Sequence, residues 1–527
     1  MKGRFITSLL AVFAIAGLQA QGIPAVPKLV VGLTIDQLRM DYIEAFSAMY
    51  GERGFKRLLK EGRVYQNAEY DFIGVDKSSS VAAIYTGTNP YVNGIVGDGW
   101  MDRSSLRVVN CVDDSNFMGV YTSESTSPVR LKVSNLSDEL MIATQGTAEV
   151  YSIAPTREMA VLSAGHASKG AFWINDETGK WSGTTYYGTF PSWVSTYNDR
   201  QGLDFRINEL VWQPFLPVSV YKYLTTDSKQ VTFKHKFSNE RQNKYRKFKT
   251  SPYANEEVNR LVNACFNSTQ IGQDQVPDLL NLAYYAGNYE HKPAVERPLE
   301  MQDVYARLDA NLAELLDIID RKVGLNNTLF FITSTGYSDP EPIDPPQYRI
   351  PNGEFHIKRC VALLNLYLAA IYGEGLYVDA HHEQEIYLNH KLIEQKQLNL
   401  PEILARSSEF LVQFSGVKEV YSSQRLMLGG WTPELEKVKN SYNPFCSGDL
   451  WVEVLPGWTI VRDHSLDTKV VRNIYTSAPL FLMGWSVRPE LIYTPVKIGR
   501  VAPTLAHFMR IRAPNAATLP PMTDIRK

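Results

Sequence analysis

Short apolar runs that alternate with amphipathic helices constrain the fold of this chain most strongly. Residues 28–35 form a continuous apolar run with the length and β-branched content of a strand buried on both faces. Residues 328–333 form a second such run, and residues 478–483 return to the same apolar composition. Residues 304–323 carry leucine and isoleucine at helical spacing. This alternation predicts an α/β fold with a largely parallel central sheet.

Residues 1–20 have the pattern of a secretory signal peptide. Lys2 and Arg4 precede the apolar residues 6–18, and Ala20 is a small residue suited to a cleavage site. The apolar run is too short to cross a membrane, and no later run is long enough. We therefore expect an exported protein, periplasmic or extracellular, that has no membrane span.

Overall composition limits the partners that this chain could bind. Its 527 residues are 44% hydrophobic and 21% charged, which is ordinary for a globular protein. The formal net charge of −2 gives no sign of a nucleic-acid partner. A protein or small-molecule ligand remains open, and the sequence does not identify it.

The cysteines leave two alternatives open. They are Cys111, Cys265, Cys360 and Cys446. In an oxidising compartment they allow up to two disulfides, with three possible pairings, or they remain buried thiols. Their wide spacing does not suggest a zinc knuckle.

Residues 71–87, a predicted turn into a small-residue helix, are the first candidate site. Backbone N–H groups at a helix start attract anions. Lys77 stands at this start, followed by Ser78, Ser79 and Ser80. Ser78 or Ser79 could supply a nucleophile, but capping of the helix and close packing is the favoured role of these serines.

Asp36 is the second candidate, because it directly follows the run 28–35. A carboxylate just past the carboxyl end of a central strand lies where open α/β sheets bind their ligands. The alternative is that Asp36 caps the following helix. Both roles are compatible with each other.

Two long stretches interrupt the regular alternation. Residues 191–251 are rich in aromatic residues and lysine, and we predict irregular surface structure there. Residues 351–455 look like an inserted unit, with helices predicted at 383–397 and 401–410. Residue types that bind metals occur together at Asp379, His381 and His382. Histidines in an exposed loop are more often solvated than bound to a metal, and we favour that interpretation.

With these features in view, the chain resembles the alkaline phosphatase superfamily, in the branch of bacterial phosphate-monoesterases related to nucleotide pyrophosphatase/phosphodiesterases. The stretches that carry the resemblance include Asp36, Tyr85-Thr86-Gly87, the strand ending at Thr333 and residues 501–505. The resemblance covers nearly all of residues 30–511. It implies a three-layer α/β/α domain across residues 21–527, in which residues 351–455 form a cap-like insertion.

The resemblance also implies a site with two zinc ions held on Asp and His side chains, beside a Thr or Ser nucleophile. Aligned with this pattern, Asp36 matches the first ligand and His291 matches another. The nucleophile position falls on Lys77, whose amine cannot perform the same phosphoryl-ester chemistry. The remaining ligand positions fall on residues that cannot replace the expected donors: Gly287, Thr335, Gly336 and Ser477.

The phosphate contacts implied by the resemblance are replaced as well. The expected Asn is Asp98, and the expected Lys-x-Arg pair falls on Thr156 and Glu158. Arg157 would compensate in part if the register were shifted by one residue. Lys77 could instead pair with Asp36, its ammonium standing in for the missing metal charge.

These replacements predict a pseudoenzyme: an alkaline phosphatase-like protein without a two-zinc site, and with no cofactor, that acts by binding or assembly. One alternative is a phosphatase/phosphodiesterase-type hydrolase of a phosphate or sulfate ester with altered metal chemistry, which would still use zinc. A further alternative is a binding protein whose old pocket takes a cationic or neutral ligand. His166 is predicted to be structural or to line that pocket.

Overall fold

The computed structural model describes residues 26–222, 231–240, 243–339, 351–429, 432–461 and 474–525. The signal peptide predicted for residues 1–20 lies outside these ranges. Within them, no helix is long and apolar enough to span a membrane.

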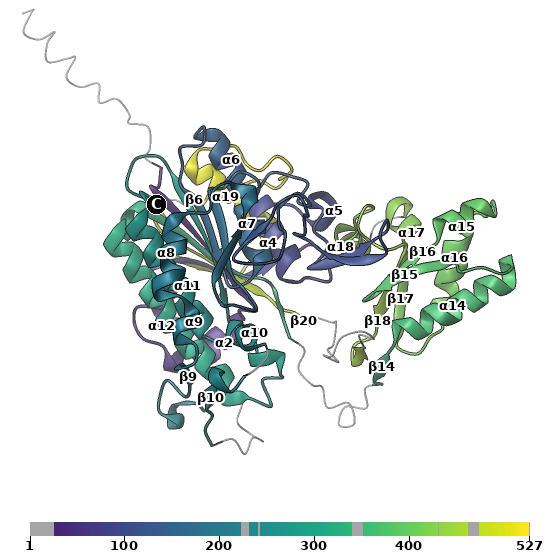
Figure 1. Cartoon of the computed structure of the whole chain (residues 1–527), viewed down its shortest axis with the longest axis horizontal. Helices are drawn as coiled ribbons and strands as arrows, with labels where there is room; N and C mark the ends of the chain where they lie inside the picture. The colour runs from purple at the N-terminus through teal and green to yellow at the C-terminus, as the bar shows by residue number, and fades with distance from the viewer. Residues whose placement is uncertain are drawn as a thin grey trace, which may run out of the picture.

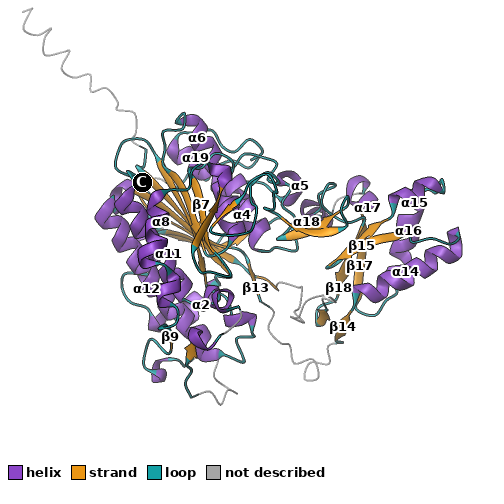
Figure 2. Ribbon diagram, in the orientation of Figure 1, coloured by secondary structure: helices purple, strands orange, loops and turns teal. Residues whose placement is uncertain are grey.

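One large twisted sheet organises the fold (Figures 1 and 2). Its parallel centre consists of β12 (Thr328–Ser334), β1 (Leu29–Asp36), β11 (Asp278–Tyr285), β6 (Val150–Ala154) and β7 (Gly170–Ile174), in that order. Antiparallel strands extend both ends: β21 (Ala478–Gly484) and β2 (Arg63–Glu69) on one side, β8 (Trp181–Thr184) and β5 (Gly119–Val120) on the other. Two short strands, β22 (Glu490–Ile492) and β23 (Val496–Lys497), run parallel to β2. The predicted α/β fold with a largely parallel sheet is confirmed.

Helices cover both faces of this sheet (Figure 1). One face carries α2 (Met40–Ala45), α3 (Phe55–Glu61), α8 (Ser192–Gln201), α11 (Tyr253–Ser268) and α12 (Pro298–Lys322). The other face carries α4 (Lys77–Thr86), α6 (Leu136–Ala143), α7 (Arg157–Ala164) and α19 (Val501–Met509). Because β1 side chains alternate, Val31 and Leu33 join the first core and Val30 joins the second. The molecule is therefore a three-layer α/β/α structure.

The prediction of irregular surface structure at residues 191–251 is wrong for much of this stretch. Besides α8 it forms α9 (Leu203–Arg206) and α10 (Lys244–Lys249), with the short strands β9 (Val211–Trp212) and β10 (His235–Lys236). Many of its described aromatic side chains lie in the core, although Phe205 and Phe215 are exposed. Trp212 is fully buried, and its indole N–H donates to Asp303.

Residues 351–455 contain a separate small sheet. It has the order β15 (Val378–His382), β16 (Glu385–Leu388), β18 (Leu450–Val454) and β17 (Val417–Ser422), with every pairing antiparallel. The helices α14 (Ile357–Tyr372) and α16 (Leu400–Leu411) pack on this sheet and enclose a core of their own. We propose on this basis that residues 351–455 are an inserted unit, called the cap below.

The first part of the helix predicted at residues 383–397 contains the strand β16 instead. The side chains of Ile386 and Leu388 alternate into the cap core, which is the two-residue period of β16. Only α15 (His390–Gln395) is helical within this range. Asp379, His381 and His382 lie on β15, and not in a loop before a helix.

The cap is fastened to the main domain through Asp449, which is 4% exposed. Its carboxylate accepts from the backbone N–H of Leu388 at 2.7 Å and from His390 Nε2 at 2.9 Å. Arg103 reaches the same carboxylate at 3.1 Å from the turn between β3 (Gly99–Asp102) and β4 (Arg107–Asn110). This group joins the cap to a hairpin of the main domain.

We predict that this fastening is tighter in mild acid than in mild base. The hydrogen bond that His390 donates to Asp449 raises the pKa of His390 above its ordinary value, although burial and Arg103 oppose the shift. A raised folded-state pKa means stabilisation that is complete below about 6.5 and lost as the pH rises through the folded pKa. Amide exchange around residues 385–390, corrected for intrinsic rates, should be slower at pH 5.5 than at pH 8.5.

His390→Gln should remove this pH dependence, while Lys391→Gln at the exposed neighbouring position should preserve it. Equal pH profiles for wild type and His390→Gln would show that His390 does not contribute.

Candidate active site

The start of α4 is built as a complete N-terminal cap. Asp76 is the capping residue, and its side chain accepts from the backbone N–H of Ser79 at 2.8 Å while the Ser79 side chain accepts from the Asp76 backbone. The predicted capping role of the serines holds for Ser79, within a cap centred on Asp76. Ser78 and Ser79 are fully buried, so neither is exposed as a replacement nucleophile.

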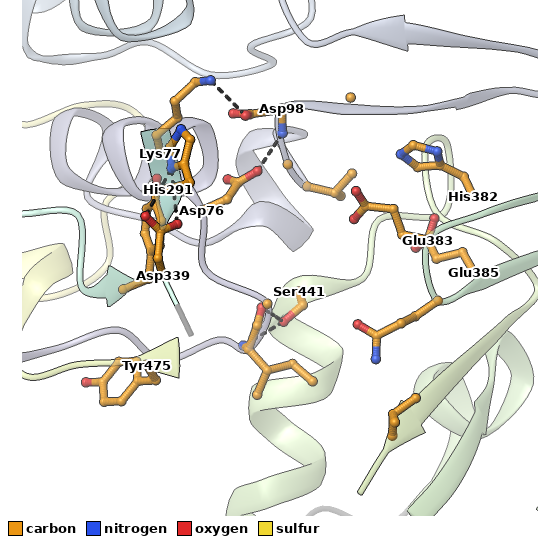
Figure 3. Close-up of a pocket in the computed structure, with 18 of the residues that line it drawn as sticks. Asp76, Lys77, Asp98, His291, Asp339, His382, Glu383, Glu385, Ser441 and Tyr475 are labelled. Atoms are coloured by element: carbon orange, nitrogen blue, oxygen red, sulfur yellow. Dashed lines mark hydrogen bonds and ion pairs between the residues drawn. The ribbon is translucent and has the colours of Figure 1, made fainter. Parts of the chain in front are cut away.

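Lys77 is the first residue of α4, and its ammonium lies between two carboxylates. Nζ lies 2.9 Å from Asp98 Oδ2 and 3.6 Å from Glu158 Oε2; Figure 3 shows the first of these pairs. The predicted ion pair between Lys77 and Asp36 is wrong as a direct contact, because Asp98 and Glu158 are the side chains that meet Nζ. Asp36 acts on Lys77 only through its field.

Charge pairing keeps Lys77 protonated. Burial alone would lower the pKa of Lys77, but Asp98 and Glu158 outweigh burial and hold this pKa well above its ordinary value. Burial alone would raise the pKa of Glu158. The positive charges of Lys77 and, to a smaller extent, Arg157 outweigh burial and hold this pKa below its usual range. The residue at the nucleophile position is therefore a paired cation at neutral pH.

Arg157 does not supply the missing phosphate contact. Its guanidinium turns to Asp113 at 2.9 Å and to Glu124 at 3.7 Å, and lies 4.0 Å from Glu158. Thr156 precedes α7 and lines the pocket, but a Thr hydroxyl carries no charge for a phosphate.

Asp36 lies at the end of β1 and is 6% exposed. Its carboxylate accepts from Thr335 Oγ1 at 2.9 Å, and Thr335 Oγ1 also accepts from the backbone N–H of Gln37. Burial raises the pKa of Asp36 to about 6, against the lowering effect of Lys77. The proposed capping role is wrong, because α2 begins at Met40 with Arg39 as its capping residue.

After β12, where the resemblance expects a pair of metal ligands, the chain has Thr335 and Gly336, which have other structural roles. Thr335 holds Asp36, as described above, and Gly336 has a φ of +75°. A Cβ at Gly336 would collide with the ring of Tyr70, which is buried and donates its hydroxyl to Ser334 O at 2.8 Å. A histidine at position 336 would therefore be strained by the backbone conformation and would collide with Tyr70.

The other three expected ligand positions, Gly287, His291 and Ser477, have different surroundings. At Gly287 a Cβ would lie 2.7 Å from Gln37 Cδ, so Gln37 takes the space that a ligand side chain needs. His291 binds Asp339 through Nδ1 at 3.0 Å and lines the pocket. Ser477 donates to Asn67 at 2.6 Å and does not line it.

The two-zinc set implied by the resemblance does not fit these side chains. Two dications need several anionic ligands, and among the ligand positions implied by the resemblance only Asp36 carries a carboxylate, which also lies in the field of the Lys77 ammonium. In the part of the chain that the structure describes, no three His, Cys, Asp or Glu side chains are grouped so as to hold a metal. This finding includes the run at Asp379, His381 and His382.

Of the two alternatives for the cysteines, the structure has buried thiols. Cys111, Cys265, Cys360 and Cys446 are all free and buried.

His166 is structural: Nδ1 lies 2.9 Å from Asp138 and Nε2 lies 3.0 Å from Leu131 O.

A cavity of about 1410 Å³ lies between the main domain and the cap. Asp36, Lys77, Asp98, Thr156 and His291 line its main-domain side, so the structure brings these predicted residues together. Figure 3 shows Glu383 and Glu385 of the cap facing this group across the space. Gly287, Glu158, Thr335, Gly336 and Ser477 are not among the lining residues.

Some site residues were missed by the sequence analysis. Asp339 fixes His291, Gln37 takes the space at Gly287, and Tyr337 hydrogen-bonds Asp36. Asp339 and Tyr337 directly follow the position of the lost ligand pair, which was the available signal.

Comparison with known proteins agrees with this architecture. The family described as type I phosphodiesterase / nucleotide pyrophosphatase matches residues 30–477. The chain is 27% identical to alkaline phosphatase PafA of Elizabethkingia meningoseptica, covering 99% of this chain and 98% of that protein. It is 27% identical to alkaline phosphatase PhoV of Synechococcus elongatus, over 95% and 93% of the two chains.

A crystal structure of wild-type PafA aligns with 96% of this chain and 100% of that one, at a TM-score of 0.85 and 26% identity. The similarity therefore extends over the sheet, the helices and the cap. The chain belongs to the type I phosphodiesterase / nucleotide pyrophosphatase family, within the alkaline phosphatase superfamily.

Proposed function

We propose that this chain is an exported, alkaline phosphatase-like pseudoenzyme that acts by binding or assembly. The observation that carries the proposal is Lys77, a paired ammonium at the position of the nucleophile. A protonated amine has no lone pair with which to attack phosphorus. Its charge also opposes any dication placed beside Asp36.

The surrounding side chains support the same conclusion. A phosphoryl group needs donors and cations where its oxygens lie. Asp98 and Glu158 instead present carboxylates, and their charge is satisfied by Lys77 rather than left to bind a ligand. The helix start keeps its shape but not the charge that favours a phosphate.

A second candidate is a phosphoric ester hydrolase with altered metal chemistry, which the sequence analysis kept as its alternative. Family membership and the relatives named as alkaline phosphatases favour this alternative more directly than they favour inactivity. Under it, Asp36 and His291 would hold zinc at the surviving ligand positions. We rank it second because of Lys77 and the refilled positions around it.

The remaining parts of the proposal rest on the sequence. Residues 1–20 are proposed to be the signal peptide and residues 21–527 the phosphatase-like domain with its cap. The pocket between the domain and the cap is the proposed place for a small-molecule or peptide ligand, of a class that its side chains do not identify.

The first test is turnover. Purified chain supplied with excess zinc should hydrolyse aryl phosphate, aryl phosphodiester and aryl sulfate no faster than a variant that carries both Asp36→Ala and His291→Ala in the same buffer. Any rate in the wild type that is at least tenfold above this variant would support the hydrolase instead.

A single substitution should not recover the chemistry. Lys77→Thr restores the family's nucleophile type, but Gly287, Thr335 and Gly336 still lack metal-binding side chains. We expect no zinc-dependent turnover from Lys77→Thr. Turnover that appears in this variant would show that the remaining side chains suffice to hold metal.

Replacing the lost histidine should instead cost stability. Gly336→His forces a side chain onto a φ of +75° and into the ring of Tyr70. Left-handed backbone and overpacking together predict a loss of about 2–4 kcal/mol in the free energy of unfolding. Urea unfolding measures this change.

Gly146→His is the matched control, because Gly146 has a φ of +79° with no atom near its Cβ. It should show only the backbone part of the loss. Equal losses in both variants would mean that Tyr70 does not block position 336.

A further inference from the structure

The carboxylates around Lys77 are held in place by neutral groups. Asp98 Oδ1 accepts from Ser78 Oγ at 2.5 Å, and the backbone N–H of Asp98 donates to Asp76 at 2.6 Å. Glu158 Oε1 accepts from Asn110 Nδ2 at 2.8 Å. The bond from Ser78 ties Asp98 to α4 and the bond from Asn110 ties Glu158 to β4, and neither bond involves the Lys77 side chain. The anionic site is thus a preformed feature of the fold.

Few positive charges are available to balance this site. Arg157 is 4.0 Å from Glu158, but it also pairs with Asp113 and Glu124. Asp36 adds a buried carboxylate and Asp76 a partly buried one near the same helix start. Uncompensated negative charges that lie close together are unfavourable, most strongly at the buried Glu158 and Asp36 and less at Asp98, whose side chain is 43% exposed. The ammonium of Lys77 is therefore the charge on which this cluster depends.

We propose that Asp98 and Glu158 form a cation-binding site whose occupant is the chain's own Lys77 ammonium, tethered through the first residue of α4. This tethered cation meets carboxylates at two positions where the resemblance expects phosphate contacts, so the site needs neither a metal nor a bound anion to balance its charge. The ligand class of the site is a primary ammonium. The inference rests on the proposed function only in that no metal takes the place of Lys77.

The position of Lys77 allows a test in which its side chain is removed and the positive charge is supplied by a free amine. Lys77 lines the cavity and its side chain is 24% exposed, so truncation to alanine opens a channel from the cavity to the carboxylates. The atoms removed by Lys77→Ala correspond to n-propylammonium. A free amine of this shape can then refill the site.

The test is thermal unfolding of Lys77→Ala with and without this amine. The variant should melt about 5 °C or more below wild type. Addition of 50 mM n-propylammonium chloride should restore at least half of this loss, whereas 1-propanol and sodium chloride at matched concentration should not. Lys77→Arg, which keeps the charge, should melt closer to wild type than Lys77→Met.

Lys169→Ala is the control, because Lys169 pairs with Glu149 at 2.7 Å away from this site. The amine should not restore it. If Lys77→Ala does not fold, refolding is measured in the amine and in propanol, with recovery expected only in the amine. A second variant, Lys77→Ala with Glu158→Gln, should melt above Lys77→Ala because one unbalanced carboxylate is gone.

Equal restoration by amine and propanol, or a Lys77→Ala variant as stable as wild type, would overturn the proposal. Chelator should leave the wild-type melting temperature unchanged, and a drop of several degrees would show that a metal, not Lys77, balances the charge. Turnover in the wild type would refute the proposed function while leaving the amine result to be judged separately.

Discussion

Charge balance at the start of α4 is the constraint to which the rest of the site conforms. Lys77 Nζ meets Asp98 and Glu158, which come from the β3 approach and from α7, so one ammonium joins three segments of the main domain. Buried carboxylates must be neutralised by a cation, a metal or a proton. In this chain the cation is a side chain of the protein, while Thr335 holds Asp36 and Tyr70 fills the space beside Gly336.

The fold of this family can be kept while its catalytic chemistry changes, because the two depend on different side chains. The sheet is held by apolar residues of β1, β11 and β12 that pack in two cores, one on each face. None of these contacts requires a metal ligand. The cap is fastened through Asp449 and Arg103, also away from the ligand positions. A chain can therefore keep the architecture of a phosphatase while its nucleophile and ligands change.

The sequence was sufficient for the fold, and it named Asp36, Lys77 and His291, which line one cavity in the structure. Buried strands such as 28–35 and 328–333 carry a pattern that local composition reveals, and the carboxyl end of β1 follows from them. Long-range pairing was not readable: Lys77 was expected to meet Asp36, but Asp98 and Glu158 are closer. Residues 191–251 were also misjudged, because an aromatic surface loop and an aromatic core segment have the same composition.

The most direct test of the account is X-ray diffraction at the zinc absorption edge, from crystals of the wild-type chain grown with zinc. The account predicts an ordered Lys77 Nζ between Asp98 and Glu158, with no anomalous peak beside Asp36 or His291. An anomalous peak coordinated by Asp36 or His291, with Lys77 displaced from Asp98, would contradict it.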